Sequence, residues 1–67
     1  MSPRKIGRML KTLREAQGLN QVELAKKAKV TTAYVSQLEA GKKKNPSLDV
    51  LQKLAKALGV PVAELLE

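Results

Sequence analysis

The sequence of 67 residues contains no cysteine, histidine, phenylalanine or tryptophan, and Tyr34 is its only aromatic residue. Without cysteine, the chain can form no disulfide bond and no Cys-type zinc site. The absence of histidine removes the commonest metal ligand and the commonest general base at neutral pH. The sequence also has no glycine-rich phosphate loop and no pairing of a nucleophile with a base. It therefore predicts a protein that is not an enzyme and uses no metal or other cofactor.

Long apolar runs are also missing. No stretch approaches the roughly 20 apolar residues that cross a bilayer, and the basic N-terminus lacks the apolar region of a signal peptide. We therefore expect a cytoplasmic protein with no membrane partner. A hydrophobic content of 43% is enough for one small aliphatic core, so residues 1–67 are predicted to form a single domain. A domain of this size is too small to enclose an ordinary ligand pocket, and no small-molecule ligand is expected.

Positive charge is abundant and unevenly distributed. The net charge is +7, from 13 basic and 6 acidic residues. Residues 1–46 hold 11 lysines and arginines against 3 glutamates, a net charge of +8, whereas residues 47–67 have a net charge of −1. This asymmetry indicates a polyanionic partner on one side of the molecule. The alternative is that the lysines only keep a small domain soluble.

Apolar periodicity predicts five helices and no strand. They are expected at about residues 3–16, 20–29, 31–41, 47–59 and 60–66. Ser2, Asn20 and Ser47 are suitable N-caps, and Glu23 follows Asn20 at capping-box spacing. Gly7 lies inside the first helix, where it is expected to cost up to about 1 kcal/mol relative to alanine.

The third predicted helix has two chemically different sides. At 100° per residue, Tyr34, Val35 and Leu38 cluster on one side, and Thr32, Ala33, Ser36 and Gln37 lie on the other. The second side carries no charge. Threonine and serine are poor helix formers, and lysine or glutamate would serve solubility better. This side is therefore predicted to be a recognition surface.

A series of short motifs follows a specific order between Ile6 and Leu66. They are Leu13-Arg14, Gly18-Leu19-Asn20-Gln21, Glu23-Leu24-Ala25, Val35-Ser36-Gln37-Leu38-Glu39, Gly41, Asn45-Pro46-Ser47 and Leu54-Ala55-Lys56-Ala57-Leu58-Gly59-Val60. In this order and spacing, the chain resembles the Cro/repressor-type helix-turn-helix family, also called the XRE family. The resemblance implies an all-α, compact five-helix, lambda-repressor-like DNA-binding domain, with its helix-turn-helix at about residues 20–41. It also implies a bacterial or phage origin.

The resemblance implies a role for each matching position. Base contacts are implied for Thr31, Thr32, Ala33, Ser36 and Gln37, and phosphate contacts for Gln21, Lys42, Lys43, Lys44 and Asn45. A phosphate contact is also predicted for the hydroxyl group of Tyr34. Gln37 can pair with N6 and N7 of adenine, and Ala33 can lie against a thymine methyl group. Alternative roles remain open: helix capping for Thr31, core packing for Tyr34, and a solvated surface for Ser36, Gln37 and the lysines.

Two further expectations concern structure rather than DNA contact. The resemblance implies a structural ion pair between Arg14 and Glu39, and losing one partner of a buried pair is expected to weaken the fold. Lys29 stands in the turn where the family usually has glycine. We therefore predict a left-handed conformation for Lys29, at a cost of roughly 1 kcal/mol.

These features together predict a sequence-specific, double-stranded DNA-binding transcription regulator, and specifically a repressor. The family resemblance implies a twofold homodimer on a pseudo-palindromic operator, with the third helix in the major groove. Val60, Val62, Leu65 and Leu66 are either the dimer surface or part of the monomer core. The alternative functions are an antitoxin, a restriction–modification controller, or a protein-interaction domain that does not bind DNA.

Overall fold

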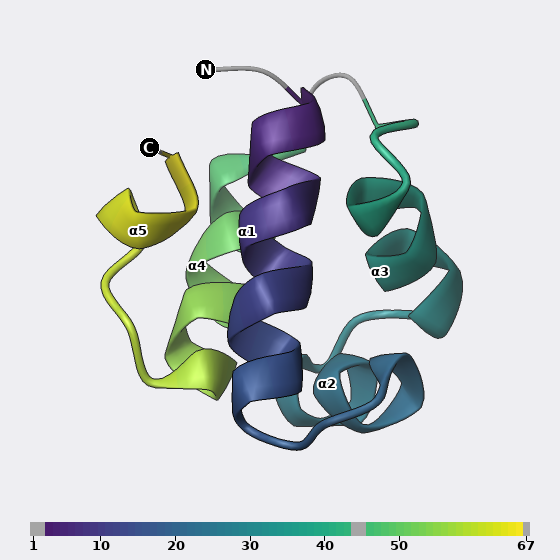
Figure 1. The fold of residues 1–67 in the computed structure, drawn as a ribbon, viewed down its shortest axis with the longest axis vertical. Helices are drawn as coiled ribbons and strands as arrows, with labels where there is room; N and C mark the ends of the chain where they lie inside the picture. Colours follow the sequence, from purple (N-terminus) through teal and green to yellow (C-terminus); the bar gives the residue numbers. More distant parts are fainter. Residues whose placement is uncertain (1–2, 44–45, 67) are drawn as a thin grey trace.

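The computed structural model describes residues 3–43 and 46–66, so the expected N-cap Ser2 lies outside the described residues. The described residues form five helices and no strand, which confirms the all-α prediction. The helices are α1 (Pro3–Ala16), α2 (Gln21–Ala28), α3 (Thr32–Glu39), α4 (Leu48–Leu58) and α5 (Ala63–Leu66) (Figure 1).

The helices pack around α1. This helix contacts α3 on one side and α5 on the other, while α2 packs against α3 and α4 (Figure 1). The buried core is aliphatic, as the composition requires. It consists of Ile6, Leu10, Leu24, Ala25, Ala28, Val35, Leu38, Leu51, Leu54, Ala55, Leu58 and Leu65. Since α3 contributes Val35 and Leu38 to this core, its opposite side must face outward.

Local capping explains where the middle helices begin. Asn20 and Glu23 form a complete capping box, in which each side chain accepts a hydrogen bond from the backbone N–H of the other residue. Thr31 and Ser47 cap α3 and α4 by accepting hydrogen bonds from the N–H groups of Tyr34 and Val50. These starts agree with the predicted ones.

Two predicted helix boundaries need correction. α3 ends at Glu39 rather than Gly41, because Gly41 is in the left-handed region with φ 74°. α5 begins at Ala63 rather than at residue 60. The N–H of Val60 instead closes the end of α4 by donating to the carbonyl of Ala55, so the chain resumes its helix only after Pro61.

The apolar C-terminal residues mainly complete the monomer core. Leu65 is fully buried, and Val60, Val62 and Leu66 are partly buried against the core. They are therefore not a free apolar surface. None of the described helices has the length and apolar character needed to cross a membrane.

Gly7 has a tertiary role that reverses the expectation drawn from helix propensity. A Cβ atom at this position would lie 2.1 Å from the carbonyl oxygen of Leu38 and 3.0 Å from Cα of Glu39. Both are backbone atoms, which cannot swing aside as a flexible side chain can. Gly7 therefore permits the close approach of α1 to α3.

We predict that Gly7→Ala destabilises the domain by about 1–3 kcal/mol, because the clash with α3 outweighs the gain in helix propensity. Urea unfolding measures the effect. Thr12→Ala, at an exposed position of the same helix, is the control and should leave stability unchanged or slightly raised. Equal stabilities of Gly7→Ala and the parent chain would contradict this account of the α1–α3 contact.

The prediction for Lys29 is confirmed. Lys29 has φ 59° and ψ 42°, and among the described residues it is the non-glycine residue with a positive φ. Its N–H donates to the carbonyl of Lys26, and that of Val30 donates to Ala25, so this conformation closes the C-terminal end of α2. The turn thus needs a left-handed residue, and lysine occupies it under strain.

We expect Lys29→Gly to raise the free energy of unfolding by up to about 1 kcal/mol, since glycine adopts this conformation without a Cβ clash. Lys29→Ala is the matched control, because it also removes the charge but keeps the strain. Thermal and urea unfolding should rank glycine above alanine at this position. A lower melting temperature for Lys29→Gly than for Lys29→Ala would refute the assignment of strain.

Candidate nucleic-acid interface

The outward side of α3 is the uncharged surface that the sequence analysis describes. Thr32, Ala33, Ser36 and Gln37 are all exposed. Figure 1 places α3 along one side of the molecule, with α1 between it and α5. The hydroxyl oxygen of Thr31 accepts a hydrogen bond from the N–H of Tyr34 at 3.1 Å, and its hydroxyl hydrogen remains available as a donor. The side therefore offers hydroxyl, amide and methyl groups on a helix held by the core.

Arg14 and Glu39 form the predicted ion pair behind this surface. Arg14 Nε donates to Glu39 Oε2 at 2.7 Å, and Nη2 donates to Oε1 at 2.9 Å, a bidentate geometry. The two side chains are only 10% and 4% exposed. Arg14 Nη1 also donates to the carbonyl oxygen of Leu19 at 2.7 Å. One guanidinium thus joins α1, the end of α3 and the segment leading into α2.

Gln21 completes this network from the first residue of α2. Its Nε2 donates to Glu39 Oε1 at 3.1 Å. The side chain of Gln21 is partly exposed, so its remaining N–H and its carbonyl oxygen can still reach a partner outside the protein. Gln21 therefore links α2 to α3 while presenting polar atoms beside the exposed side of α3.

The pair is charged in the folded protein. Burial raises the pKa of Glu39, but the hydrogen bonds from Arg14 and Gln21 and the attraction of Arg14 outweigh burial and bring that pKa below its ordinary value. The hydrogen bond to Glu39 raises the pKa of Arg14 against the opposing effect of burial. Both groups therefore stay ionised near neutral pH.

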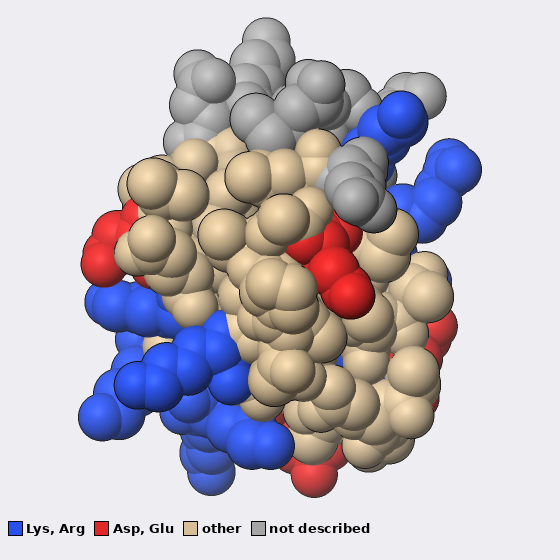
Figure 2. Space-filling view, turned by 90° about the vertical axis from the view of Figure 1, so that its left-hand side faces the viewer, with Lys and Arg blue, Asp and Glu red and all other residues tan. Residues whose placement is uncertain are grey.

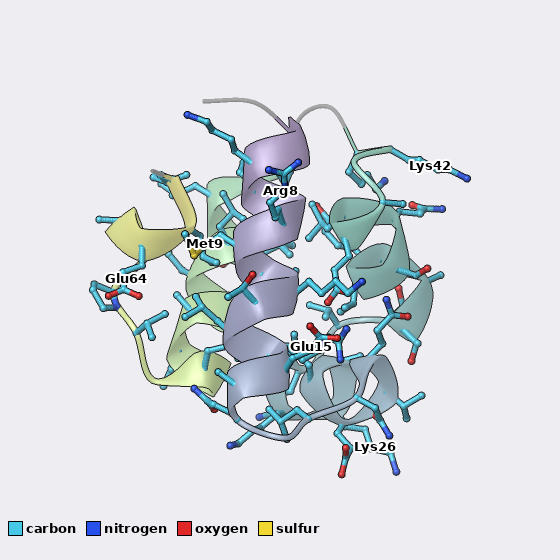
Figure 3. All side chains as sticks on the ribbon, in the orientation of Figure 1. Arg8, Met9, Glu15, Lys26, Lys42 and Glu64 are labelled. Atoms are coloured by element: carbon cyan, nitrogen blue, oxygen red, sulfur yellow. The ribbon has the colours of Figure 1, made fainter. Side chains whose placement is uncertain are left out.

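Basic side chains lie at the C-terminal end of α3. Lys43 Nζ is 5.0 Å from the centre of the Tyr34 ring, a cation–π contact that joins the loop to α3. Lys42 is exposed and points outward from the same loop (Figure 3). Lys44 and Asn45, for which phosphate contacts are also implied, lie outside the described residues. The loop can thus present ammonium groups next to the uncharged side of α3.

Comparison with known proteins agrees with this geometry. A helix-turn-helix family model matches residues 10–65. The chain is 41% identical to the HTH-type transcriptional regulator DdrOP3 of Deinococcus deserti, over 94% of this chain and 48% of that protein. The chain belongs to the helix-turn-helix family. This XRE-type family comprises DNA-binding transcription regulators. The chain spans about half the length of the DdrOP3 protein.

Two solved structures of helix-turn-helix proteins have the same fold. The restriction–modification controller C.AhdI from Aeromonas hydrophila aligns with a TM-score of 0.90 at 40% identity, covering 94% of each chain. SinR, a master regulator for biofilm formation crystallised in complex with DNA, aligns with a TM-score of 0.89 at 39% identity. That alignment covers 92% of this chain and 98% of the SinR chain in that crystal structure.

Tertiary contacts bring together residues of the candidate interface that belong to different elements. Gln21 of α2 bonds to Glu39 of α3, and Lys43, which follows α3, lies over the ring of Tyr34. The hydrogen bond from Arg14 to the carbonyl oxygen of Leu19 was not predicted from the sequence. The one sequence signal for this bond is that Leu19 directly precedes Asn20, the N-cap of α2, at the point where the chain turns from α1 into α2.

We predict that the free energy of unfolding falls as the pH drops below about 4.3, the ordinary pKa of glutamate. The pKa of Glu39 is lowered by folding, so its contribution is complete above the unfolded pKa. That contribution is lost as the pH falls through the folded pKa. Urea unfolding between about pH 2 and 7, in steps of about one pH unit, measures this loss.

In that series, Glu39→Gln should remove part of the acid-dependent loss, because it removes the titrating group. Glu64→Gln, at an exposed position of α5, should leave the loss unchanged. An identical pH dependence in Glu39→Gln and the parent chain would show that the Glu39 carboxylate does not stabilise the fold.

Proposed function

We propose that this chain binds double-stranded DNA in a sequence-specific manner and represses transcription. In this proposal α3 enters the major groove, which is wide enough for a helix. Thr31, Thr32, Ala33, Ser36 and Gln37 contact base edges. Gln21, Tyr34 and the loop residues Lys42, Lys43, Lys44 and Asn45 contact phosphates.

The observation that carries the proposal is the combination of an uncharged, exposed side on α3 with polar and basic groups beside it. Gln21 lies beside α3 through its bond to Glu39, and Lys43 lies over Tyr34. Base edges are read by hydrogen bonds and methyl contacts, whereas phosphates attract cations. The surface therefore offers groups that can pair with base edges on α3, and groups that can bind DNA phosphates next to it.

A twofold dimer on a pseudo-palindromic operator is part of the proposal. A single α3 reads only a few base pairs, and two copies related by a dyad would read half-sites about one helical turn apart. Because the C-terminal apolar residues largely complete the monomer core, the dimer contact would use only their partly exposed edges. Such a contact would be small, so DNA would promote assembly.

A second candidate function is that of a restriction–modification controller. It is favoured by the likeness to C.AhdI, with 94% of each chain aligned. Such a controller would use the same DNA surface, so the two candidates differ in their target genes rather than in their chemistry. The operator sequence recovered by selection distinguishes them, according to which promoter contains it.

Selection of bound sequences from random duplexes should recover a half-site repeated with dyad symmetry. We predict that Gln37→Ala lowers the free-energy difference between the preferred base pair and the others at one position by about 1–3 kcal/mol, since it removes a side chain that can form two hydrogen bonds with adenine. Lys43→Gln should instead weaken binding to all sequences and reduce the salt slope by about 0.9. Fluorescence anisotropy across a salt series separates the two effects. If no motif is enriched, the proposal fails.

A further inference from the structure

A hollow of about 700 Å³ lies where the C-terminal ends of α2 and α4 meet the residues after α1. Figure 2 views the molecule from the side opposite α3, and basic side chains gather at its lower left, towards the end at which α4 terminates. The hollow is separate from the exposed side of α3, and the proposed DNA contacts do not use its lining.

Four lysines line this hollow. Lys27 comes from α2, Lys29 from the turn after it, and Lys53 and Lys56 from α4. No carboxylate is among the lining residues. In the described part of the chain, one ion pair offsets them: Lys53 Nζ lies 3.4 Å from Asp49 Oδ2, with both side chains largely exposed. Such an exposed pair contributes little, so positive charge remains in excess.

The partial negative charges at the C-terminal ends of α2 and α4 are too small to neutralise four lysines. The C-terminus of an α-helix carries roughly half a negative charge, so α2 and α4 together offset about one lysine. Both ends are also closed by the backbone, because Lys29 and Gly59 donate N–H groups to carbonyls of the last turns. Repulsion among the remaining ammonium groups costs free energy unless an anion relieves it.

The shape of the hollow is held by the fold. Gln17 Nε2 donates a hydrogen bond to the carbonyl oxygen of Leu58, which ties the end of α1 to the end of α4. Ala28, Ala57 and Leu58 give the lining an apolar part. A volume of about 700 Å³ is within the range of small-ligand sites, roughly 300–1,000 Å³, so the expectation that the domain is too small for such a pocket was wrong. A concave site suits a compact anion better than the convex backbone of a duplex.

We propose that this hollow is a binding site for a small polyphosphate, with the four lysines holding the phosphate groups. Lysine binds phosphate as a point charge, and each ammonium group offers three donors. The apolar part of the lining could cover one face of a nucleoside base. The site is independent of the DNA-binding proposal and does not rest on it.

Titration with sodium tripolyphosphate tests the site, using amide chemical shifts and calorimetry at moderate ionic strength. The expected result is saturable binding with the largest shifts at Ala28, Lys29 and Ala57 to Gly59. Adenosine triphosphate distinguishes the source of the phosphate: tighter binding than tripolyphosphate indicates a nucleotide, and equal binding indicates an inorganic polyphosphate. Both results support the site, whereas shifts confined to α3, Lys42 and Lys43 would overturn it.

Two double variants separate the hollow from general charge attraction. Lys53→Gln with Lys56→Gln should weaken tripolyphosphate binding at least about tenfold, because it removes two of the four cations. Lys11→Gln with Lys26→Gln removes the same charge from exposed positions outside the hollow, and should change binding less than about twofold. Equal losses in both variants would overturn the proposal. So would duplex DNA shifting the amides of the hollow, since the lysines would then be part of the DNA interface.

Discussion

The bidentate pair between Arg14 and Glu39 is the interaction on which the arrangement of α1, α2 and α3 depends. Its carboxylate lies at the last residue of α3, its guanidinium lies in the last turn of α1, and Gln21 at the start of α2 shares one carboxylate oxygen. Apolar contacts in a small aliphatic core are not directional. The pair supplies direction, because a planar guanidinium accepts a carboxylate only in a narrow geometry.

Gly7 and the ion pair act on the same two helices. The backbone of α1 approaches α3 closely at Gly7, next to Leu38 and Glu39, and the pair ties the same end of α3 two turns further along α1. The close approach limits translation of α3, and the pair limits its rotation. Together they hold Thr32, Ala33, Ser36 and Gln37 facing outward. A surface that reads base edges needs this rigidity, because base hydrogen bonds tolerate little misplacement.

Much of the fold could be predicted because its signals are local. Apolar spacing and caps such as Asn20 and Ser47 determine where helices begin, and the positive φ of Lys29 was expected from the glycine that the family usually has at this turn position. The role of Gly7 could not be predicted from helix propensity, since it depends on a helix distant in sequence. The same reason hid the contact of Lys43 with Tyr34 and the convergence of Lys27, Lys29, Lys53 and Lys56. The pairing of Arg14 with Glu39 came from family resemblance, because charge patterns alone leave many partners open.

A double-mutant cycle between Arg14 and Glu39 tests the central role of the pair most directly. The free energy of unfolding would be measured for Arg14→Ala, Glu39→Ala, the double variant and the parent chain. We predict that each single variant is strongly destabilised, because it leaves one buried charge without its partner. The double variant should then be less destabilised than the sum of the two, with a coupling energy of about 1–3 kcal/mol. Additive effects, with a coupling below about 0.5 kcal/mol, would contradict the claim that this pair holds the three helices together.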